Sequence, residues 1–283
     1  MKLRFTKMHG ISNDYVYIST FDQEIPDPEQ LAVRLSDRRT GIGGDGIILV
    51  CPADGADAKM RIFNADGSEG KMCGNGIRCV GKFVYDKGLV PPEKTVITID
   101  TLSGIKTLDL TVEDGKVQSA RVDMGAAILK PSDIPVRYHG DKMVNAPLIV
   151  GRREWRVTAV SMGNPHCVTF TDDVDGLDLE KIGPSFEKHP AFPDRVNTEF
   201  VRVIDDHTLQ MRVWERGSGE TWACGTGACA TAVAACLNGF CKKGEDITVR
   251  LRGGDLVINY TDETVIMTGP ASTVFEGEVE IES

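Results

Sequence analysis

Two cysteines in this sequence stand in the same short pattern, and that pattern could support proton transfer at carbon. Cys73 opens Cys-Gly-Asn-Gly and Cys224 opens Cys-Gly-Thr-Gly. Each follows an apolar strand-like segment and a glycine-containing turn, and each precedes a window with helical periodicity. The first N–H groups of a helix lack partners within the helix and carry partial positive charge. This setting favours a thiolate and can also bind a carboxylate.

The two patterns belong to a longer internal repeat. Cys224 lies 151 residues after Cys73 (224 minus 73), and the same offset places Asn13 on Asn164. We infer a duplicated unit of strands plus one helix, and therefore two pseudo-equivalent halves.

The repeat also predicts where the two halves begin and end. The first half is expected to cover residues 1–125 and the second half residues 126–269. The sequence does not decide whether 270–283, with a strand near 274–281, returns to the first half.

Two such elements can face each other across one ligand, which gives a sulfur base on each side of a carbon. One thiolate would remove the proton from the α-carbon while the opposite thiol delivers another, so the stereocentre inverts. Helix-end donors aimed at the carboxylate would stabilise the enolate-like charge that develops. The chemistry predicted by the pair is racemisation or epimerisation of an amino acid.

Strands dominate the elements that must position these cysteines. Helical periodicity is confined to 28–38, 75–87, 179–189 and 226–238. Alternating or β-branched segments are typical of strands, for example at 15–19, 59–63, 96–101, 156–160, 199–204, 209–214, 247–251 and 256–260. Strict strand–helix alternation is missing, so the pattern argues against a doubly wound parallel sheet.

Composition excludes several classes of protein. The chain has 283 residues and a net charge of -10, which argues against nucleic acid or an anionic membrane as the main partner. No signal peptide or run of 18 apolar residues is present, so we expect a cytoplasmic protein.

Six further cysteines lack matching partners in the repeat, and for each of them buried packing is the expected role. They are Cys51, Cys79, Cys167, Cys229, Cys236 and Cys241. The spacings from Cys224 onward, five, seven and five residues, do not match zinc or iron–sulfur motifs, so no metal site is predicted. His166 and Glu215 could tune the thiol pKa values if they line the same site; taken alone, a satisfied surface histidine and a solvated glutamate are the favoured interpretations.

Several motifs together resemble diaminopimelate epimerase. They are Phe63 to Glu69, Cys73 to Cys79, Trp214 to Thr221, Ala223 to Gly227, Gly41-Ile42-Gly43 with Asp45, Gly163 to His166, and Arg195 to Glu199. The resemblance spans the chain from Asn13 to Gly227. It implies a fold of class α/β (α+β), with two pseudo-symmetric halves, each a curled, mostly antiparallel sheet around a central helix, and a site in the cleft between them.

The resemblance also implies a reaction: epimerisation of LL-2,6-diaminopimelate to meso-diaminopimelate, on the route to lysine and peptidoglycan, without pyridoxal phosphate or metal. The family is commonly dimeric, which implies a homodimer. Its catalytic cysteines fall on Cys73 and Cys224, and its pKa-modulating residues fall on His166 and Glu215. Its substrate contacts fall on Asn13, Asn64, Gly74, Asn75, Asn164, Asn197, Glu215, Arg216, Gly225 and Thr226. Arg216 would pair with the distal carboxylate, and the amides with Glu215 would bind the distal ammonium group.

One position departs from the family pattern. Some members carry a substrate-contacting glutamine where this sequence has Gly46, so a backbone contact alone is expected there.

Two alternatives remain open at this stage. Proline racemases and hydroxyproline epimerases share the fold and the paired cysteines, although a proline ring offers no distal group to Arg216. A protein of another class, a thiol-rich metal-binding or redox-sensing protein, would perform no isomerisation.

Overall fold

The computed structural model describes residues 2–281, which form two compact units. Unit 1 comprises Met1–Asp123 and Thr268–Ser283, and unit 2 comprises Met124–Met267. Within the described residues lie eighteen strands, four α-helices and one short 3-10 helix (Pro131–Asp133). No helix in this part of the chain is both long and apolar enough to span a bilayer.

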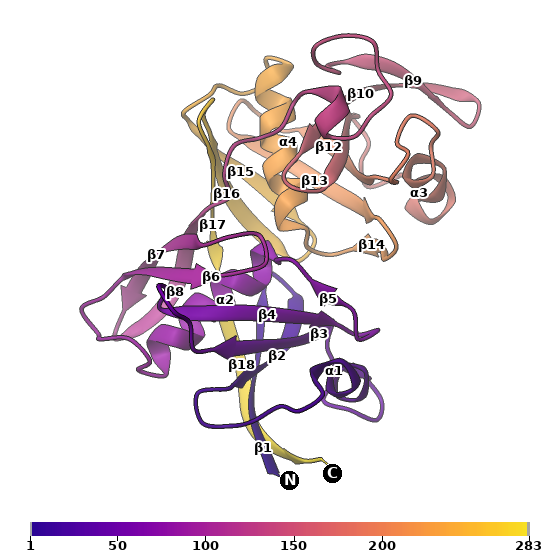
Figure 1. Cartoon of the computed structure of the whole chain (residues 1–283). Coiled ribbons are helices and arrows are strands. Elements are labelled where there is room, and N and C mark those ends of the chain that lie inside the picture. The colour runs from indigo at the N-terminus through magenta and orange to yellow at the C-terminus, as the bar shows by residue number, and fades with distance from the viewer. Residues whose placement is uncertain (1, 282–283) are drawn as a thin grey trace. The chain divides into compact units, whose positions relative to one another are not determined.

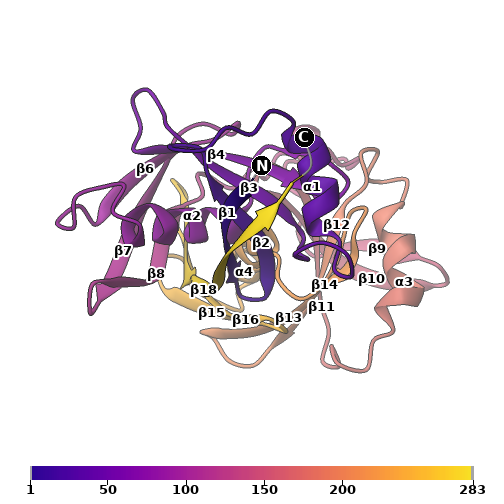
Figure 2. The same cartoon turned by 90° about the horizontal axis from the view of Figure 1, so that it is seen from below.

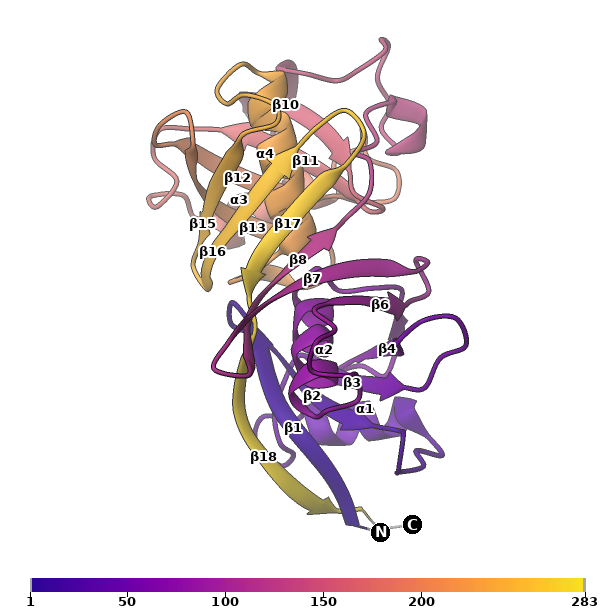
Figure 3. The ribbon, with the colours of Figure 1, turned by 90° about the vertical axis from the view of Figure 1, so that its left-hand side faces the viewer.

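Unit 1 is a mostly antiparallel sheet around one helix. Its elements are β1 (Lys2–Gly10), β2 (Asn13–Ser19), α1 (Pro28–Ser36), β3 (Gly46–Cys51), β4 (Ala58–Asn64), β5 (Glu69–Gly70), α2 (Gly74–Asp86), β6 (Val96–Asp100), β7 (Lys106–Glu113), β8 (Lys116–Asp123) and β18 (Ser272–Glu280). The pairs β2–β3 and β4–β6 are parallel, whereas β1–β2, β3–β4, β6–β7 and β7–β8 are antiparallel. Helix α2 packs against β1–β4 and β6–β8 and so lies at the centre of the unit (Figure 3).

The final strand belongs to unit 1. β18 pairs antiparallel with β1, with Lys2 opposite Glu280, and the two strands run side by side in Figure 3. The segment 270–283, whose placement the sequence left undecided, therefore lies with the first half as far as it is described.

Unit 2 repeats this plan. Its elements are β9 (Ala146–Val150), β10 (Arg153–Ser161), β11 (Pro165–Phe170), α3 (Leu179–Glu187), β12 (Asn197–Val203), β13 (Thr208–Glu215), β14 (Gly219–Thr221), α4 (Gly225–Leu237), β15 (Asp246–Leu251), β16 (Gly254–Tyr260) and the start of β17 (Val265–Pro270). Here β11–β12 and β13–β15 are the parallel pairs. Helix α4 contacts β10–β13, β15 and β16 (Figure 1), and α3 lies at the outside against β9 and β12–β14 (Figure 2).

The offset of 151 residues relates the two units element by element. It carries β1 onto β10, α1 onto α3 and α2 onto α4 with identical bounds. It also carries the register of β3–β4, where Ile47 faces Phe63, onto that of β12–β13, where Thr198 faces Trp214. The mixed, mostly antiparallel fold with a central helix in each half, expected from the resemblance, is confirmed.

The two central helices are buried in different ways. Almost all of α4 is small or apolar, from Ala228 to Ala235, so strands can pack closely on every side. Helix α2 instead buries two cations. Arg78 donates to the carbonyl of Gly74 at 3.0 Å, and Lys82 donates to the carbonyl of Val117 at 2.6 Å. These partners compensate for the lost hydration of the charges.

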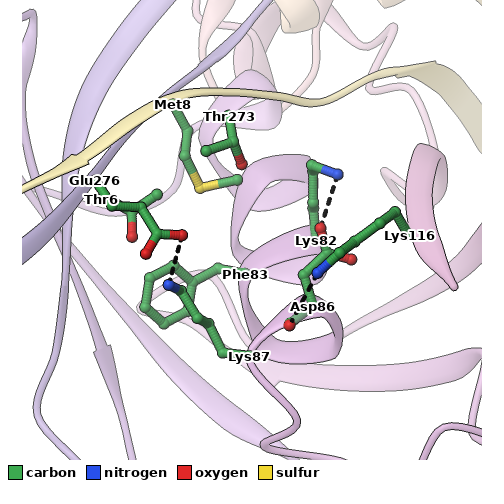
Figure 4. Close-up of a pocket in the computed structure, with 9 residues that line it drawn as sticks. All are labelled: Thr6, Met8, Lys82, Phe83, Asp86, Lys87, Lys116, Thr273 and Glu276. Carbon is green, nitrogen blue, oxygen red and sulfur yellow. Dashed lines mark hydrogen bonds and ion pairs between the residues drawn. The ribbon is translucent and has the colours of Figure 1, made fainter.

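A cavity of about 350 Å3 lies beside the C-terminal end of α2, away from Cys73 (Figure 4). Its ionic groups have protein partners: Lys82 pairs with Asp86 at 2.8 Å, Lys87 pairs with Glu276 at 2.7 Å, and Lys116 donates to the carbonyl of Asp86 at 3.5 Å. We therefore assign it no ligand.

Candidate active site

Both cysteines are N-cap residues of the central helices, as the sequence predicts. Cys73 (φ −126°, ψ 120°) precedes α2 and Cys224 (φ −128°, ψ 104°) precedes α4. This extended conformation is usual for an N-cap, and it directs the side chain toward the exposed N–H groups of the first turn. The Cys73 sulfur accepts a hydrogen bond from the Gly76 N–H at 3.3 Å.

Around Cys73, an amide is fixed by an ionic network. The Cys73 thiol donates to Asn13 Oδ1 at 3.3 Å, and Asn13 Nδ2 donates to Asp45 at 2.7 Å. Arg38 joins Asp45 at 2.9 Å and Asp14 at 2.6 Å. Asn13 is thus held with its oxygen toward the sulfur. Asp45, which belongs to the motif at Gly41-Ile42-Gly43, holds the Asn13 amide in this orientation.

Two of the other predicted contacts of unit 1, Gly74 and Asn75, lie in the first turn of α2, and the third, Asn64, lies at the end of β4. Asn64 ends β4, and its amide nitrogen donates to Ser68 Oγ at 3.0 Å. Asn75 is buried in the first turn of α2, with its side-chain oxygen bonded to Arg78 at 3.0 Å. Gly74 is the first residue of α2.

Only glycine fits at position 46, because the backbone of the paired strand lies too close for a side chain. A Cβ at this position would lie 2.1 Å from the carbonyl oxygen of Phe63 on the paired strand. The strand pairing therefore explains why this chain has no side chain at that position.

Around Cys224, unit 2 brings together four polar side chains: Asn164, His166, Glu199 and Thr226. His166 Nδ1 lies 2.7 Å from Glu199 Oε1, and His166 Nε2 lies 3.1 Å from Asn164 Oδ1. Asn164 Nδ2 donates to Thr226 Oγ1 at 3.4 Å, and this hydroxyl lies 3.7 Å from the Cys224 sulfur. His166 and Glu199 are both fully buried.

Glu215, the last residue of β13, also lies beside Cys224. Its carboxylate accepts hydrogen bonds from the Thr221 hydroxyl and the Cys224 thiol. Burial raises the pKa of Glu215, although these hydrogen bonds oppose the rise. His166 is fully buried and Glu215 is partly buried beside Cys224, so neither is the surface side chain that the sequence favoured; that they tune the thiol pKa values stays a prediction.

The expectation that a helix start would favour the thiolate is wrong for Cys224 in this structure. Burial, followed by the neighbouring carboxyl group of Glu215, raises the pKa of Cys224 well above its ordinary value. Desolvation of the anion outweighs the helix dipole because a partial charge at the helix end compensates for only part of the lost hydration.

Asn197 and Arg216 are joined by a hydrogen bond, with Asn197 buried and Arg216 at the surface. Asn197 Oδ1 accepts from the backbone N–H of Arg216 at 2.8 Å, and the guanidinium of Arg216 donates to the carbonyl of Asp194 at 2.9 Å. The Arg216 side chain is exposed, so it is available to an anion. Gly225 is the first residue of α4.

The remaining cysteines fall into two groups. Cys79, Cys167, Cys229 and Cys241 are buried, whereas Cys51 and Cys236 are partly exposed. Burial raises the pKa of Cys79 to about 11 and that of Cys236 to about 12, so these thiols are protonated at neutral pH.

Comparisons with known proteins agree over the whole chain. The family model for diaminopimelate epimerase matches residues 5–130 and 158–274. The chain is 54% identical to diaminopimelate epimerase of Acetivibrio thermocellus over 281 residues, covering 99% of each chain. It is 54% identical to that of Agathobacter rectalis over 288 residues, covering 99% of this chain and 100% of the relative.

Solved structures extend the likeness to the fold. A hydroxyproline epimerase from Agrobacterium vitis superposes with a TM-score of 0.71 at 16% identity, covering 98% of this chain and 92% of that one. A phenazine biosynthesis protein of the PhzF family from Bacillus anthracis superposes with a TM-score of 0.72 at 16% identity, covering 99% and 100%. These likenesses concern the fold alone, whereas the sequence matches identify the family. The chain belongs to the diaminopimelate epimerase family.

Proposed function

We propose that this chain epimerises LL-2,6-diaminopimelate to meso-diaminopimelate by a two-base mechanism that uses Cys73 and Cys224 and needs no cofactor or metal. The observation that carries the proposal is the pair of N-cap cysteines at equivalent places in two repeated units. The family membership and the names of the 54% identical relatives supply the substrate and the isomerase class.

The reaction requires both sulfurs to approach one α-carbon from opposite faces. In one direction, a thiolate takes the α-proton and the other thiol delivers its proton to the opposite face, so the roles of the two sulfurs are exchanged after each turnover. The N–H groups at the starts of α2 and α4 would bind the reacting carboxylate and stabilise the charge that develops on it.

Substrate specificity is proposed to depend on the other end of the molecule. Arg216 would bind the distal carboxylate through paired hydrogen bonds, and Asn64, Asn197 and Glu215 would bind the distal ammonium group. Asn13, Asn75, Asn164 and Thr226 would line the path between the two ends. A polar site of this kind discriminates against substrates that lack the second charged end.

The alternatives differ in what they require. A proline racemase-type activity would leave Arg216 and the asparagine set without a distal partner, and the likeness to the hydroxyproline epimerase is at 16% identity. For the metal-binding alternative, no set of three or more His, Cys, Asp or Glu side chains in residues 2–281 is grouped so as to hold a metal ion. We propose neither.

The test is an assay of the purified chain with LL-diaminopimelate in deuterated water. We expect epimerisation with incorporation of deuterium at the α-carbon, and loss of both in Cys73→Ala and Cys224→Ala with the fold retained. Cys229→Ala, also in α4, serves as the matched control and should keep its activity. Exchange at the parent rate in either catalytic variant would rule out the two-base mechanism, and turnover of proline in place of diaminopimelate would reassign the substrate.

We also propose a cytoplasmic homodimer. The acidic composition supports the location, since nothing in it favours a membrane surface. Two apolar side chains on β18, Val274 and Phe275, are 55% and 45% exposed and support a partner on this strand. Light scattering of the parent protein and of Phe275→Ser measures the mass directly, and a monomeric parent would exclude the homodimer.

A further inference from the structure

Glu199 is a buried acidic residue to which the two-base mechanism assigns no role. It lies on β12, is fully buried, and contacts His166 at 2.7 Å through Oε1. Its second oxygen, Oε2, has no hydrogen-bond partner among the described residues. A buried carboxylate normally has several donors, because each unpaired oxygen of the anion loses its hydration.

The hydrogen bonds beyond His166 determine where its ring proton lies. Asn164 Nδ2 donates to Thr226 Oγ1, so the amide oxygen of Asn164 faces His166 Nε2. An oxygen accepts, and therefore Nε2 carries a hydrogen. Nδ1 then either accepts a hydrogen bond from a neutral Glu199 or, in the imidazolium form, donates a hydrogen bond to an ionised Glu199.

The surroundings favour the neutral acid. The titratable groups facing Glu199 are His166 and Cys167 on β11, Glu215 at the end of β13 and Cys224 at the start of α4. His166 is the one potential cation among these four groups. Burial raises the pKa of Glu199, and the His166 contact offsets only part of that rise. A neutral acid leaves a carbonyl oxygen unpaired, which costs less than leaving half of an anion unpaired.

We propose that Glu199 is a positioning residue that stays protonated and donates to His166 Nδ1, holding the imidazole neutral with its hydrogen on Nε2. The donors then all point one way: Glu199 to His166, His166 to Asn164, Asn164 to Thr226, and the Thr226 hydroxyl to the Cys224 sulfur. Such a chain polarises each bond in turn and stabilises a thiolate at its end. This inference rests on the proposed function for its catalytic consequence.

The relay is specific to unit 2. The offset of 151 residues places His166 on Tyr15 and Glu199 on Ile48, neither of which can form an equivalent pair. Gly227 makes the relay possible, since a Cβ there would lie 2.7 Å from Glu199 Oε1. The two cysteines therefore have chemically different support although their helices are equivalent.

The first test observes the ring directly. In protein labelled with nitrogen-15 histidine, two-bond proton–nitrogen correlation spectra distinguish the two neutral tautomers from the cation, and His166→Gln identifies the signals. We expect the neutral Nε2–H form near pH 7 in the parent and in Glu199→Gln, whose amide also donates to Nδ1. An imidazolium or an Nδ1–H tautomer in the parent would overturn the proposal, whatever the protein's activity.

The second test compares two substitutions kinetically. Glu199→Gln mimics the neutral acid and should keep kcat within about three-fold of the parent. Glu199→Leu removes the donor and should lower kcat by about ten- to hundred-fold, the usual effect of losing a partner that orients a functional histidine. Equal losses in both variants, or no loss in either, would overturn the proposal.

Thr198→Val is the matched control. Thr198 is the neighbour of Glu199 on β12, equally buried, and its hydroxyl also lacks a partner among the described residues, but it lies on the opposite face of the strand. Its substitution should change neither kcat nor the His166 signals. If the parent protein fails to turn over diaminopimelate, the proposed function fails, while the histidine spectra still decide the protonation of Glu199.

Discussion

Gly76 and Gly227 occupy equivalent positions in the first turns of α2 and α4, and their replacement by alanine should have unequal effects. In Gly227→Ala the new Cβ would lie 2.7 Å from Glu199 Oε1 and 3.1 Å from the Cys224 sulfur. In Gly76→Ala it would lie 2.7 Å from Ile48 Cδ1, the end of a flexible side chain, and 3.3 Å from the Cβ of Cys73.

The size of the effect follows from these distances. Ordinary contact begins at 3.4 Å, so Glu199 Oε1 must move by 0.7 Å (3.4 minus 2.7) and the sulfur by 0.3 Å (3.4 minus 3.1), unless the start of α4 itself shifts. A misplacement of 1 Å can cost about a hundred-fold in rate. In proportion, we expect a loss of about four-fold if only the sulfur moves, and about 25-fold if the helix start takes up the whole shift. Gly76→Ala requires about 0.1 Å at Cys73 and should lose less than about two-fold.

Stability should distinguish the two variants less clearly than rate. Alanine gains about 1 kcal/mol over glycine in a helix, and overpacking costs about 1–3 kcal/mol. The net cost for Gly227→Ala is therefore about 0–2 kcal/mol. The assay is deuterium incorporation from solvent into LL-diaminopimelate, with urea unfolding of both variants. Equal rates for the two variants, with the folds intact, would refute the inference that there is no room for a methyl group beside the Cys224 sulfur.

Three further outcomes are expected. Arg216→Ala should lower kcat/KM for diaminopimelate by about ten- to hundred-fold, the value of a charged hydrogen bond, without gaining activity on proline. The control Arg250→Ala, at an exposed position of β15, should leave the rate unchanged. Burial and Glu215 raise the pKa of Cys224, so Glu215→Gln should lower the pH at which mass spectrometry detects half-maximal alkylation of Cys224; an unchanged or higher pH would contradict the assigned cause. Burial acts to raise the pKa of Asp57, but hydrogen bonds from Lys94 and Thr98 outweigh it and hold the pKa below 3.8. Asp57→Asn should therefore lower the free energy of unfolding by about 1–2 kcal/mol at pH 7. Unfolding in urea at a series of pH values should show this difference shrinking as the pH falls below 3.8 through the pKa of the folded protein.

Local pattern was sufficient to predict the helices and the repeat. All four helices begin within one residue of the predicted positions, because α1, α2 and α3 have an apolar periodicity, α4 is a run of small apolar residues, and each follows an N-cap residue. The glycines that end α2 and α4 have φ of 68° at Gly88 and 78° at Gly239, a conformation that favours glycine. The pairing of β18 with β1 could not be predicted, because it joins residues at opposite ends of the chain.

The candidate site was predictable in its residues but not in its electrostatics. Glu199 occurs in a strand-like segment, where an acidic residue usually indicates a solvent-exposed face, and its burial depends on His166 and Gly227, which are distant in sequence. The raised pKa of Cys224 has the same origin, since desolvation depends on which side chains surround the sulfur. A signal existed in the repeat itself, because Ile48 is the equivalent of Glu199 and a charged residue at an apolar position of a duplication is unexpected.

The pairing of β1 with β18 has a consequence for synthesis on the ribosome. Unit 2 is one continuous segment, whereas unit 1 is interrupted and needs its last strand from the end of the chain. Nascent domains usually fold in order from the N-terminus, but here the later unit has all its residues first. The long β1 must wait, with one edge unpaired, until β18 has been synthesised. A circular permutant that joins the end of β18 to the start of β1 and begins at residue 124 would deliver β18 just ahead of β1, and it should shorten the time during which that edge is open to aggregation.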